Sequence, residues 1–178
     1  MTCIIGLEED GRVYIGADSC TSNGGFDRDS VLDKKIFRKN GFIFAHTGTV
    51  RAKQIIEHLI DFPSPKTFDD NFVINKIAEP IRSKFKEIGY SEIKDNQEST
   101  EDGFIIAYKQ SAYFIYSNYT VSRNKDGLIT AGCGGRFARG AMLALKDLPP
   151  IERIERALEI ASICSVAVES PFEIWETT

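Results

Sequence analysis

Cysteine is scarce in this sequence and long apolar runs are absent, and each shortage excludes a class of protein. The 178 residues include four widely separated cysteines that form no CxxC pair: Cys3, Cys20, Cys133 and Cys164. We therefore expect reduced thiols in a cytoplasmic protein, and neither a zinc site nor a disulfide framework. No apolar run approaches the roughly 18 residues of a membrane span, and no signal-peptide pattern opens the chain. We expect neither export nor contact with a membrane.

An excess of basic charge is also absent. The net charge of -4 at pH 7 gives no broad basic surface for phosphate backbones, so we expect no nucleic-acid partner. Neither a complete P-loop nor a dinucleotide fingerprint occurs, and we expect no cofactor, whereas metal binding stays open. What is present is an apolar fraction of 42%, enough for a sizeable core. The length suits one domain, residues 1–178.

Two turn signals divide the first part of the chain into hairpins. Residues 3–7 and 12–17 are short and β-rich, and Asp10-Gly11 lies between them. Residues 35–38 and 42–45 form a second such pair around Asn40-Gly41. Asp-Gly and Asn-Gly are strong signals for two-residue hairpin loops. The sequence therefore predicts two consecutive antiparallel hairpins.

Apolar side chains then recur at helical spacing in four stretches. The first, residues 52–60, should end before Pro63. The second, residues 74–88, contains Pro80, which lacks a backbone donor, so we expect two short helices or one bent helix. The other two predicted helices cover residues 137–145 and 154–161.

The remaining segments complete a pattern of alternating blocks. Residues 94–102 are polar and predict a loop. Further strands are predicted at residues 104–108, 112–116, 128–131 and 172–175. Blocks of strands between pairs of helices favour antiparallel sheets covered by helices over a parallel βαβ sheet. We therefore predict an α+β fold in which two antiparallel sheets lie between two helix pairs.

Thr2 carries the first candidate chemistry. If Met1 is removed, the threonine hydroxyl gains its own α-amino group as a neighbouring general base. The ordinary pKa of that amine, roughly 7.7–8.0, leaves an appreciable neutral fraction near pH 7. The alternative is that Thr2 is only a small residue that permits removal of methionine.

Several motifs together carry a family resemblance. The sequence resembles the proteasome β-subunit and HslV-like family of N-terminal nucleophile (Ntn) hydrolases over nearly its whole length. The resemblance rests on the order and spacing of Thr2-Cys3-Ile4-Ile5, Gly16-Ala17-Asp18-Ser19, Lys34-Lys35-Ile36, Gly48-Thr49, Gly132-Cys133-Gly134-Gly135 and Ala157-Leu158-Glu159-Ile160-Ala161. It implies a four-layer αββα sandwich, in agreement with the element order above.

The resemblance also implies roles for individual residues. By position, Thr2 matches the family's nucleophile, Asp18 its buried acid and Lys35 its catalytic lysine. Gly48 matches the glycine whose backbone N–H stabilises the oxyanion. Without the resemblance, Asp18 is better explained as a strand-end or turn residue. Lys34 is the alternative assignment for the lysine, because only one of the two adjacent side chains can point inward.

Substrate-binding positions follow from the same resemblance. It implies that Ser22, His46 and Val50 bind substrate, with His46 lining the pocket for a substrate side chain. A histidine there can titrate near neutral pH and alter specificity, but a hydrogen-bonded structural histidine is the alternative.

Two departures from the family pattern stand out. The loop 132–135 has Cys133 where the family commonly has a serine. Near the end of the last helix, Ile163, Cys164 and Ser165 occupy a region in which the family often has an aspartate. The glycine loop before a helix is also compatible with phosphate binding, although the phosphate-binding motifs are incomplete.

The resemblance implies a function and partners. We expect a threonine endopeptidase that assembles with copies of itself into a ring and cleaves peptides or unfolded proteins. The resemblance also implies an ATP-dependent unfoldase of the AAA+ class as a partner, and because this chain has no nucleotide-binding motif, the ATPase would be a separate chain. Two alternatives stay open: an Ntn amidase that cleaves small amides, and a catalytically silent scaffold in which Met1 blocks the nucleophile.

Overall fold

The computed structural model describes residues 2–22, 28–29, 33–94 and 96–178. Its strands are β1 (Ile4–Glu9), β2 (Arg12–Ala17), β3 (Thr21–Ser22), β4 (Arg28–Asp29), β5 (Ile36–Lys39), β6 (Phe42–Thr47), β7 (Glu92–Lys94), β8 (Gln97–Ser99), β9 (Gly103–Tyr108), β10 (Ser111–Ile115), β11 (Val121–Ser122), β12 (Leu128–Ala131) and β13 (Glu173–Glu176). Its helices are α1 (Val50–Leu59), α2 (Asp70–Val73), the π-helical turn η1 (Ile74–Ala78), α3 (Glu79–Glu87), α4 (Gly135–Ala144) and α5 (Pro150–Cys164).

Both predicted hairpins are confirmed, and their turns have the expected backbone. Asp10 and Gly11 have φ angles of 52° and 73° between β1 and β2. Asn40 and Gly41 have φ angles of 49° and 86° between β5 and β6. Two central residues with positive φ match the twist of the flanking strands, and Asn, Asp and Gly tolerate that conformation best. The turn sequence therefore sets the register of each hairpin.

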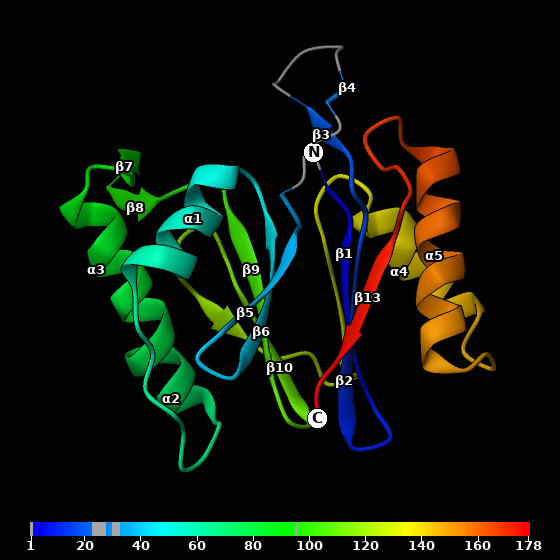
Figure 1. Cartoon of the computed structure of the whole chain (residues 1–178), viewed down its shortest axis with the longest axis horizontal. Coiled ribbons are helices and arrows are strands. Elements are labelled where there is room, and N and C mark those ends of the chain that lie inside the picture. Colours follow the sequence, from blue (N-terminus) through cyan, green and yellow to red (C-terminus); the bar gives the residue numbers. More distant parts are fainter. Residues whose placement is uncertain (1, 23–27, 30–32, 95) are drawn as a thin grey trace.

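Two antiparallel sheets form the middle of the molecule. One has the strand order β12-β1-β2-β13, and the other has the order β11-β10-β9-β6-β5. The last strand of the chain, β13, pairs with β2 near the beginning of the chain. Figure 1 shows the two sheets face to face, with α1, α2 and α3 outside one sheet and α4 and α5 outside the other.

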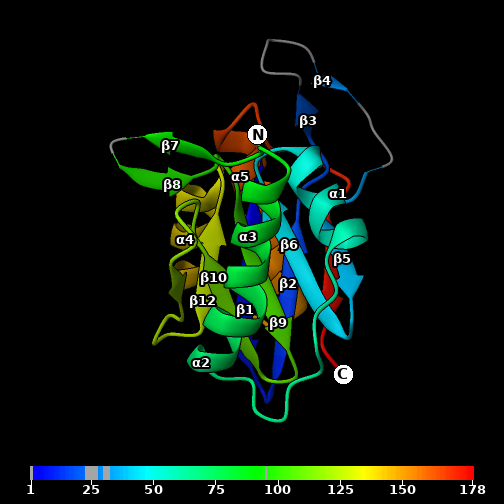
Figure 2. The same cartoon turned by 90° about the vertical axis from the view of Figure 1, so that its left-hand side faces the viewer.

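Three hydrophobic clusters separate these four layers. The first lies between the five-stranded sheet and α1, η1 and α3, and includes Phe44, Ile56 and Phe85. A second cluster joins β1 to α4 and α5, and a third fills the space between the sheets. The view in Figure 2 has the α1–α3 layer in front of the sheets. The predicted α+β sandwich, two antiparallel sheets between helix layers, is confirmed.

The helical stretch around Pro80 is continuous but changes its winding. The N–H of Glu79 donates to the carbonyl of Ile74 at the end of the π-helical turn η1, and α3 then starts with Pro80 in its first turn. Pro80 has no N–H to donate, and its ring crowds the carbonyl four residues earlier, which favours a wider turn at this point. The expected disturbance at Pro80 is thus a π-helical turn just before it.

The prediction of a loop at residues 94–102 is wrong in part. Strands β7 and β8 pair there as a small separate hairpin. Its side chains are mostly polar, and Ile93 is 73% exposed. Because neither face is buried, the segment shows no alternation of apolar and polar residues that would indicate a strand. The sequence reasoning also missed the two-residue strands β3, β4 and β11.

None of the helices in the described ranges combines the length and the apolar composition that a bilayer crossing requires.

Candidate active site

Thr2 lies just before β1 and is buried, with 3% of its surface exposed. Its backbone is held by the loop that precedes α4. The Thr2 carbonyl accepts from the Gly134 N–H at 3.2 Å and from the Cys133 thiol at 3.3 Å. The Thr2 N–H donates to Cys133 Sγ at 3.3 Å. Met1, whose removal the chemistry would need, lies outside the described residues.

The glycines of that loop are explained by this close approach. Gly132 has a φ of +87°, and a Cβ there would lie 2.1 Å from the Thr2 carbonyl oxygen. At Gly134 a Cβ would lie 2.8 Å from the Cβ of Cys3. The N–H groups of Gly134 and Gly135 already donate to carbonyls within the protein. The loop therefore serves to grip the start of β1, and this arrangement does not favour a phosphate site.

Asp18 follows β2 and is the most connected side chain of the site. Its Oδ1 accepts from the Cys3 N–H and from Lys35 Nζ, each at 2.7 Å. Its Oδ2 accepts from the N–H groups of Cys20 at 3.0 Å and Glu169 at 3.4 Å. A buried carboxylate needs such donors to compensate for lost hydration. Asp18 thus joins the start of β1, the end of β2 and the segment after α5.

The structure also distinguishes the two adjacent lysines. The Lys35 side chain is 7% exposed and forms its ion pair with the fully buried side chain of Asp18. Lys34 is 59% exposed and pairs with Glu173 at 2.5 Å on the surface. The geometry therefore brings Lys35, and not Lys34, into the site.

His46 lies on β6, opposite the residue before β5. Its backbone N–H donates to the carbonyl of Lys35 at 3.0 Å. The ring is buried, and among the described residues its Nδ1 has no hydrogen-bond partner. Burial, followed by the charges of Lys53 and Lys35, lowers the pKa of His46 to about 4. The imidazole is therefore neutral at pH 7, which argues against a charge switch at that pH.

Gly48 connects β6 to α1 in a conformation that requires glycine. Its φ is +104°, and a Cβ there would lie 2.1 Å from Asp102 Oδ1 and 2.9 Å from Asp102 Cα. Thr49 then caps α1, because its side chain accepts from the Ala52 N–H. Val50 is the half-buried first residue of α1. Ser22 ends β3, and its side chain lies outside the described residues.

Sequence reasoning missed two contributors to the site. Glu169 acts through its backbone N–H, which any residue could supply, so no sequence signal exists for it. Asp102 packs against Gly48. Its only sequence signal is its position at the end of a polar stretch, just before a predicted strand. Cys3, by contrast, is a buried strand residue: burial raises its pKa to about 12, so its thiol is inert.

Ser165 lies in the region near the end of the last helix where the sequence departs from the family pattern. Ser165 follows the end of α5, and its Oγ accepts from the Ala167 N–H at 3.3 Å. This bond shapes the turn that leaves α5. Within the described ranges, no group of three or more His, Cys, Asp or Glu side chains could hold a metal ion.

No protein-family model and no curated protein sequence matches this chain. Solved structures do. Thiobacillus denitrificans BPH is 23% identical, with a TM-score of 0.82 and coverage of 98% of this chain and 96% of that one. BPH in complex with epoxomicin gives 21% identity, a TM-score of 0.80 and coverage of 98% and 97%. HslV from Trypanosoma brucei gives 17% identity, a TM-score of 0.70 and 98% coverage of both chains.

The Anbu complex from Pseudomonas aeruginosa, described as a helical assembly, is 14% identical, with a TM-score of 0.69 and coverage of 98% of this chain and 80% of that one. Identities this low show a shared fold. The chemistry of the site therefore has to be argued from its own residues.

Proposed function

We propose that this chain, which has the proteasome-like fold of the N-terminal nucleophile hydrolases, is a threonine endopeptidase. The observation that carries the proposal is the sharing of Asp18 Oδ1. That oxygen accepts from Lys35 Nζ and from the N–H of Cys3, the residue next to Thr2. A buried ammonium is thereby tied to the backbone of the proposed nucleophile.

The chemistry begins once Met1 has been removed. The free α-amine of Thr2, with an ordinary pKa of roughly 7.7–8.0, takes the proton from the Thr2 hydroxyl as the oxygen attacks the peptide carbonyl. The tetrahedral intermediate then expels the amine of the departing peptide, which receives that proton. An ester on Thr2 remains. Water, deprotonated by the same amine, hydrolyses this ester and restores the hydroxyl.

The neighbouring residues lower the cost of the charges that develop. The Lys35 ammonium, held by Asp18, favours negative charge at the attacking oxygen. The Gly48 N–H is the proposed donor to the oxyanion. One such donor contributes about 2.7–4 kcal/mol in known hydrolases, or roughly 10²–10³-fold in turnover.

The site residues on β3, β6 and α1 are proposed to bind substrate. Ser22 would contact the peptide backbone, whereas His46 and Val50 would line the pocket for a side chain. The buried, neutral imidazole of His46 supports this role, because its Nδ1 is left to hydrogen-bond a substrate group.

Assembly is the second part of the proposal. We propose that the chain forms a ring of identical subunits in the cytoplasm that encloses its active sites and degrades peptides or unfolded proteins. The description of the Anbu neighbour as a helical assembly supports self-association of this fold. An AAA+ unfoldase would be a separate chain, with substrates delivered to the enclosed sites.

Intact mass spectrometry with a peptide epoxyketone tests the chemistry. Such a reagent reacts with a hydroxyl and an adjacent free amine, and the BPH neighbour is described in complex with epoxomicin. We expect loss of Met1 and one epoxomicin adduct on the wild type, a slower adduct on Thr2→Ser, and none on Thr2→Ala.

The opposite results separate the alternatives. A mature Thr2 that remains unlabelled, in a chain that cleaves no peptide, would favour the scaffold. The presence of Cys133 in place of serine is the feature that favours this second candidate. Turnover of small amides without turnover of peptides would favour the amidase.

A further inference from the structure

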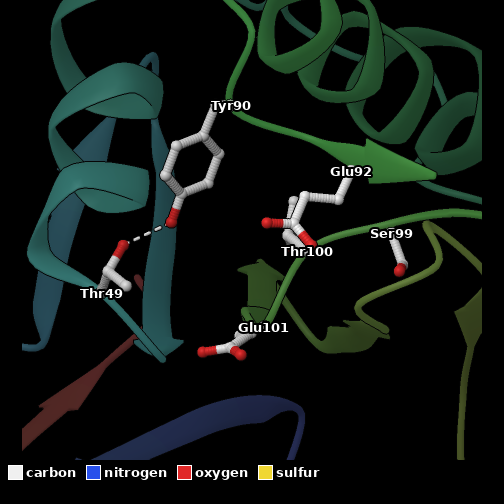
Figure 3. Close-up of a pocket in the computed structure, with 6 residues that line it drawn as sticks. All are labelled: Thr49, Tyr90, Glu92, Ser99, Thr100 and Glu101. Atoms are coloured by element: carbon white, nitrogen blue, oxygen red, sulfur yellow. Dashed lines mark hydrogen bonds between the residues drawn. The ribbon is translucent and has the colours of Figure 1, made fainter. Parts of the chain in front are cut away.

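Thr49, Tyr90 and Asp102 form a closed ring of hydrogen bonds next to Gly48. The Thr49 N–H donates to Asp102 Oδ1 at 2.7 Å, and the Tyr90 hydroxyl donates to Asp102 Oδ2, also at 2.7 Å. A short hydrogen bond between the Thr49 and Tyr90 hydroxyls closes the ring. Figure 3 shows the Tyr90 hydroxyl pointing toward Thr49 along one side of a pocket that Glu92, Ser99, Thr100 and Glu101 also line.

The protons in this ring have one consistent direction. Tyr90 has a single hydroxyl proton, which it gives to Asp102, so Thr49 must be the donor in the bond between the two hydroxyls. The Thr49 oxygen remains free to accept from the Ala52 N–H at 3.2 Å. Both oxygens of Asp102 act as acceptors, as expected of an ionised carboxylate.

The ring fixes one of the two peptide groups that flank Gly48. The peptide between Gly48 and Thr49 is held by the Thr49 N–H bond to Asp102. On the other side, Thr47 pairs with Gly103 in the ladder between β6 and β9. With both sides held, the two backbone angles of Gly48 have little freedom, and its N–H keeps one direction.

Asp102 is unusual among the buried acids of this protein. Asp102 is 1% exposed, yet none of the ion pairs among the described residues includes it. Burial raises its pKa, so the carboxylate is costly here. Asp18, in contrast, has the ammonium of Lys35. A buried carboxylate without a cationic partner makes sense if its two oxygens are needed to hold the Thr49 N–H and the Tyr90 hydroxyl in place.

We propose that Asp102, together with Tyr90, is a positioning residue that aims the Gly48 N–H at the oxyanion. This inference rests on the proposed function. Because it acts through Gly48, loss of Asp102 should lower the rate of the chemical step and leave substrate binding almost unchanged.

The test compares Asp102→Ala with Asp102→Asn in the assembled protein, using a fluorogenic peptide that the wild type cleaves. Asparagine can accept from the Thr49 N–H and donate to the Tyr90 oxygen, with the hydroxyl bond reversed, so the ring survives. Alanine removes both acceptors. We expect Asp102→Ala to lower kcat by about 10–100-fold, less than the roughly 10²–10³-fold of a lost donor, with KM within about twofold. Asp102→Asn should restore most of kcat.

Tyr90→Phe gives an independent test, because it opens the ring and keeps the Thr49 N–H bond. We expect a smaller loss of kcat, about 3–10-fold, by the same reasoning. Tyr116→Phe is the matched control: Tyr116 is 45% exposed, and among the described residues its hydroxyl accepts a single 3.4 Å bond, from Ser122. It should behave as the wild type.

Hydrogen–deuterium exchange supplies a readout that does not need turnover. A fragment that spans residues 46–50 should exchange faster in Asp102→Ala and stay protected in Asp102→Asn. Unchanged exchange, or equal kcat in the alanine variant and the wild type, would overturn the inference. Equal losses in the asparagine and alanine variants would do so too. A wild type that neither cleaves peptide nor takes up epoxomicin overturns the proposed function, and the exchange data then decide whether the ring holds the turn.

Discussion

Replacing Asp18 by asparagine should destabilise the protein more than replacing Lys35 by methionine. In the wild type, Asp18 accepts three backbone N–H bonds and the Lys35 ammonium. Methionine at 35 removes the ammonium but leaves the three N–H donors on the carboxylate. Asparagine at 18 keeps one oxygen, and in either orientation its NH₂ group faces donors that previously had an acceptor.

The magnitudes follow from these contacts. Removing one partner of a buried ion pair costs about 3–5 kcal/mol, and we expect about 3 kcal/mol for Lys35→Met because the carboxylate remains well solvated by N–H groups. Asp18→Asn leaves the Lys35 ammonium buried and also strands at least one N–H, which adds about 1–3 kcal/mol. Its total of about 5 kcal/mol or more approaches the whole stability of many domains, about 5–15 kcal/mol.

Urea unfolding at constant pH and protein concentration measures both values. Arg12→Met is the matched control, because Arg12 and Glu176 form an ion pair at 3.2 Å in which both side chains are about half exposed. Such pairs contribute about 0–1 kcal/mol. A larger loss in Lys35→Met than in Asp18→Asn would refute the reasoning. So would losses below about 1 kcal/mol in both variants.

Three further predictions concern the surroundings of Thr2. Gly132→Ala should shift Thr2 and slow epoxomicin labelling, because the new Cβ would overlap the Thr2 carbonyl. Gly11→Ala is the control: its φ is +73° and no atom lies within 4 Å of the new Cβ, so it should lower the stability by only the roughly 1–2 kcal/mol of a left-handed residue and leave labelling unchanged. Alkylation of the exposed Cys133 with iodoacetamide should slow labelling of the wild type, and Cys133→Ser should resist; equal inhibition of both would disprove this. Burial lowers the pKa of His46 from 6.5 to about 4, so the unfolded chain binds a proton there that the folded chain does not. Stability should therefore fall by up to about 3 kcal/mol as the pH drops from about 6.5 to 4, and His46→Leu should lose less over that range in urea unfolding.

The order of strands and helices was predictable because its signals are local. The Asp10-Gly11 and Asn40-Gly41 turns need positive φ at two residues, and few residue types allow it. The helices that cover the sheets carry apolar residues at a period of 3.6, which survives in any tertiary context. Where burial is missing, as in the hairpin of β7 and β8, the pattern is missing as well.

The candidate site was predictable only in part. Motif order pointed to Thr2, Asp18, Lys35 and Gly48, and the structure joins the first three through hydrogen bonds that link Cys3, Asp18 and Lys35. Adjacent lysines, however, have the same sequence signal. Only the fold decides which of them is buried.

By itself, the sequence determined the main helices and the longer strands, their order and the chemical groups available. The tertiary structure decided which backbone groups meet those side chains. Glu169, near the far end of the chain, reaches Asp18, and Asp102, just before β9, accepts from Thr49, just before α1. A backbone N–H belongs to every residue except proline, so its use as a partner leaves no mark in the sequence. Contacts of this kind appear only once the two sheets have packed and brought distant segments within hydrogen-bond distance.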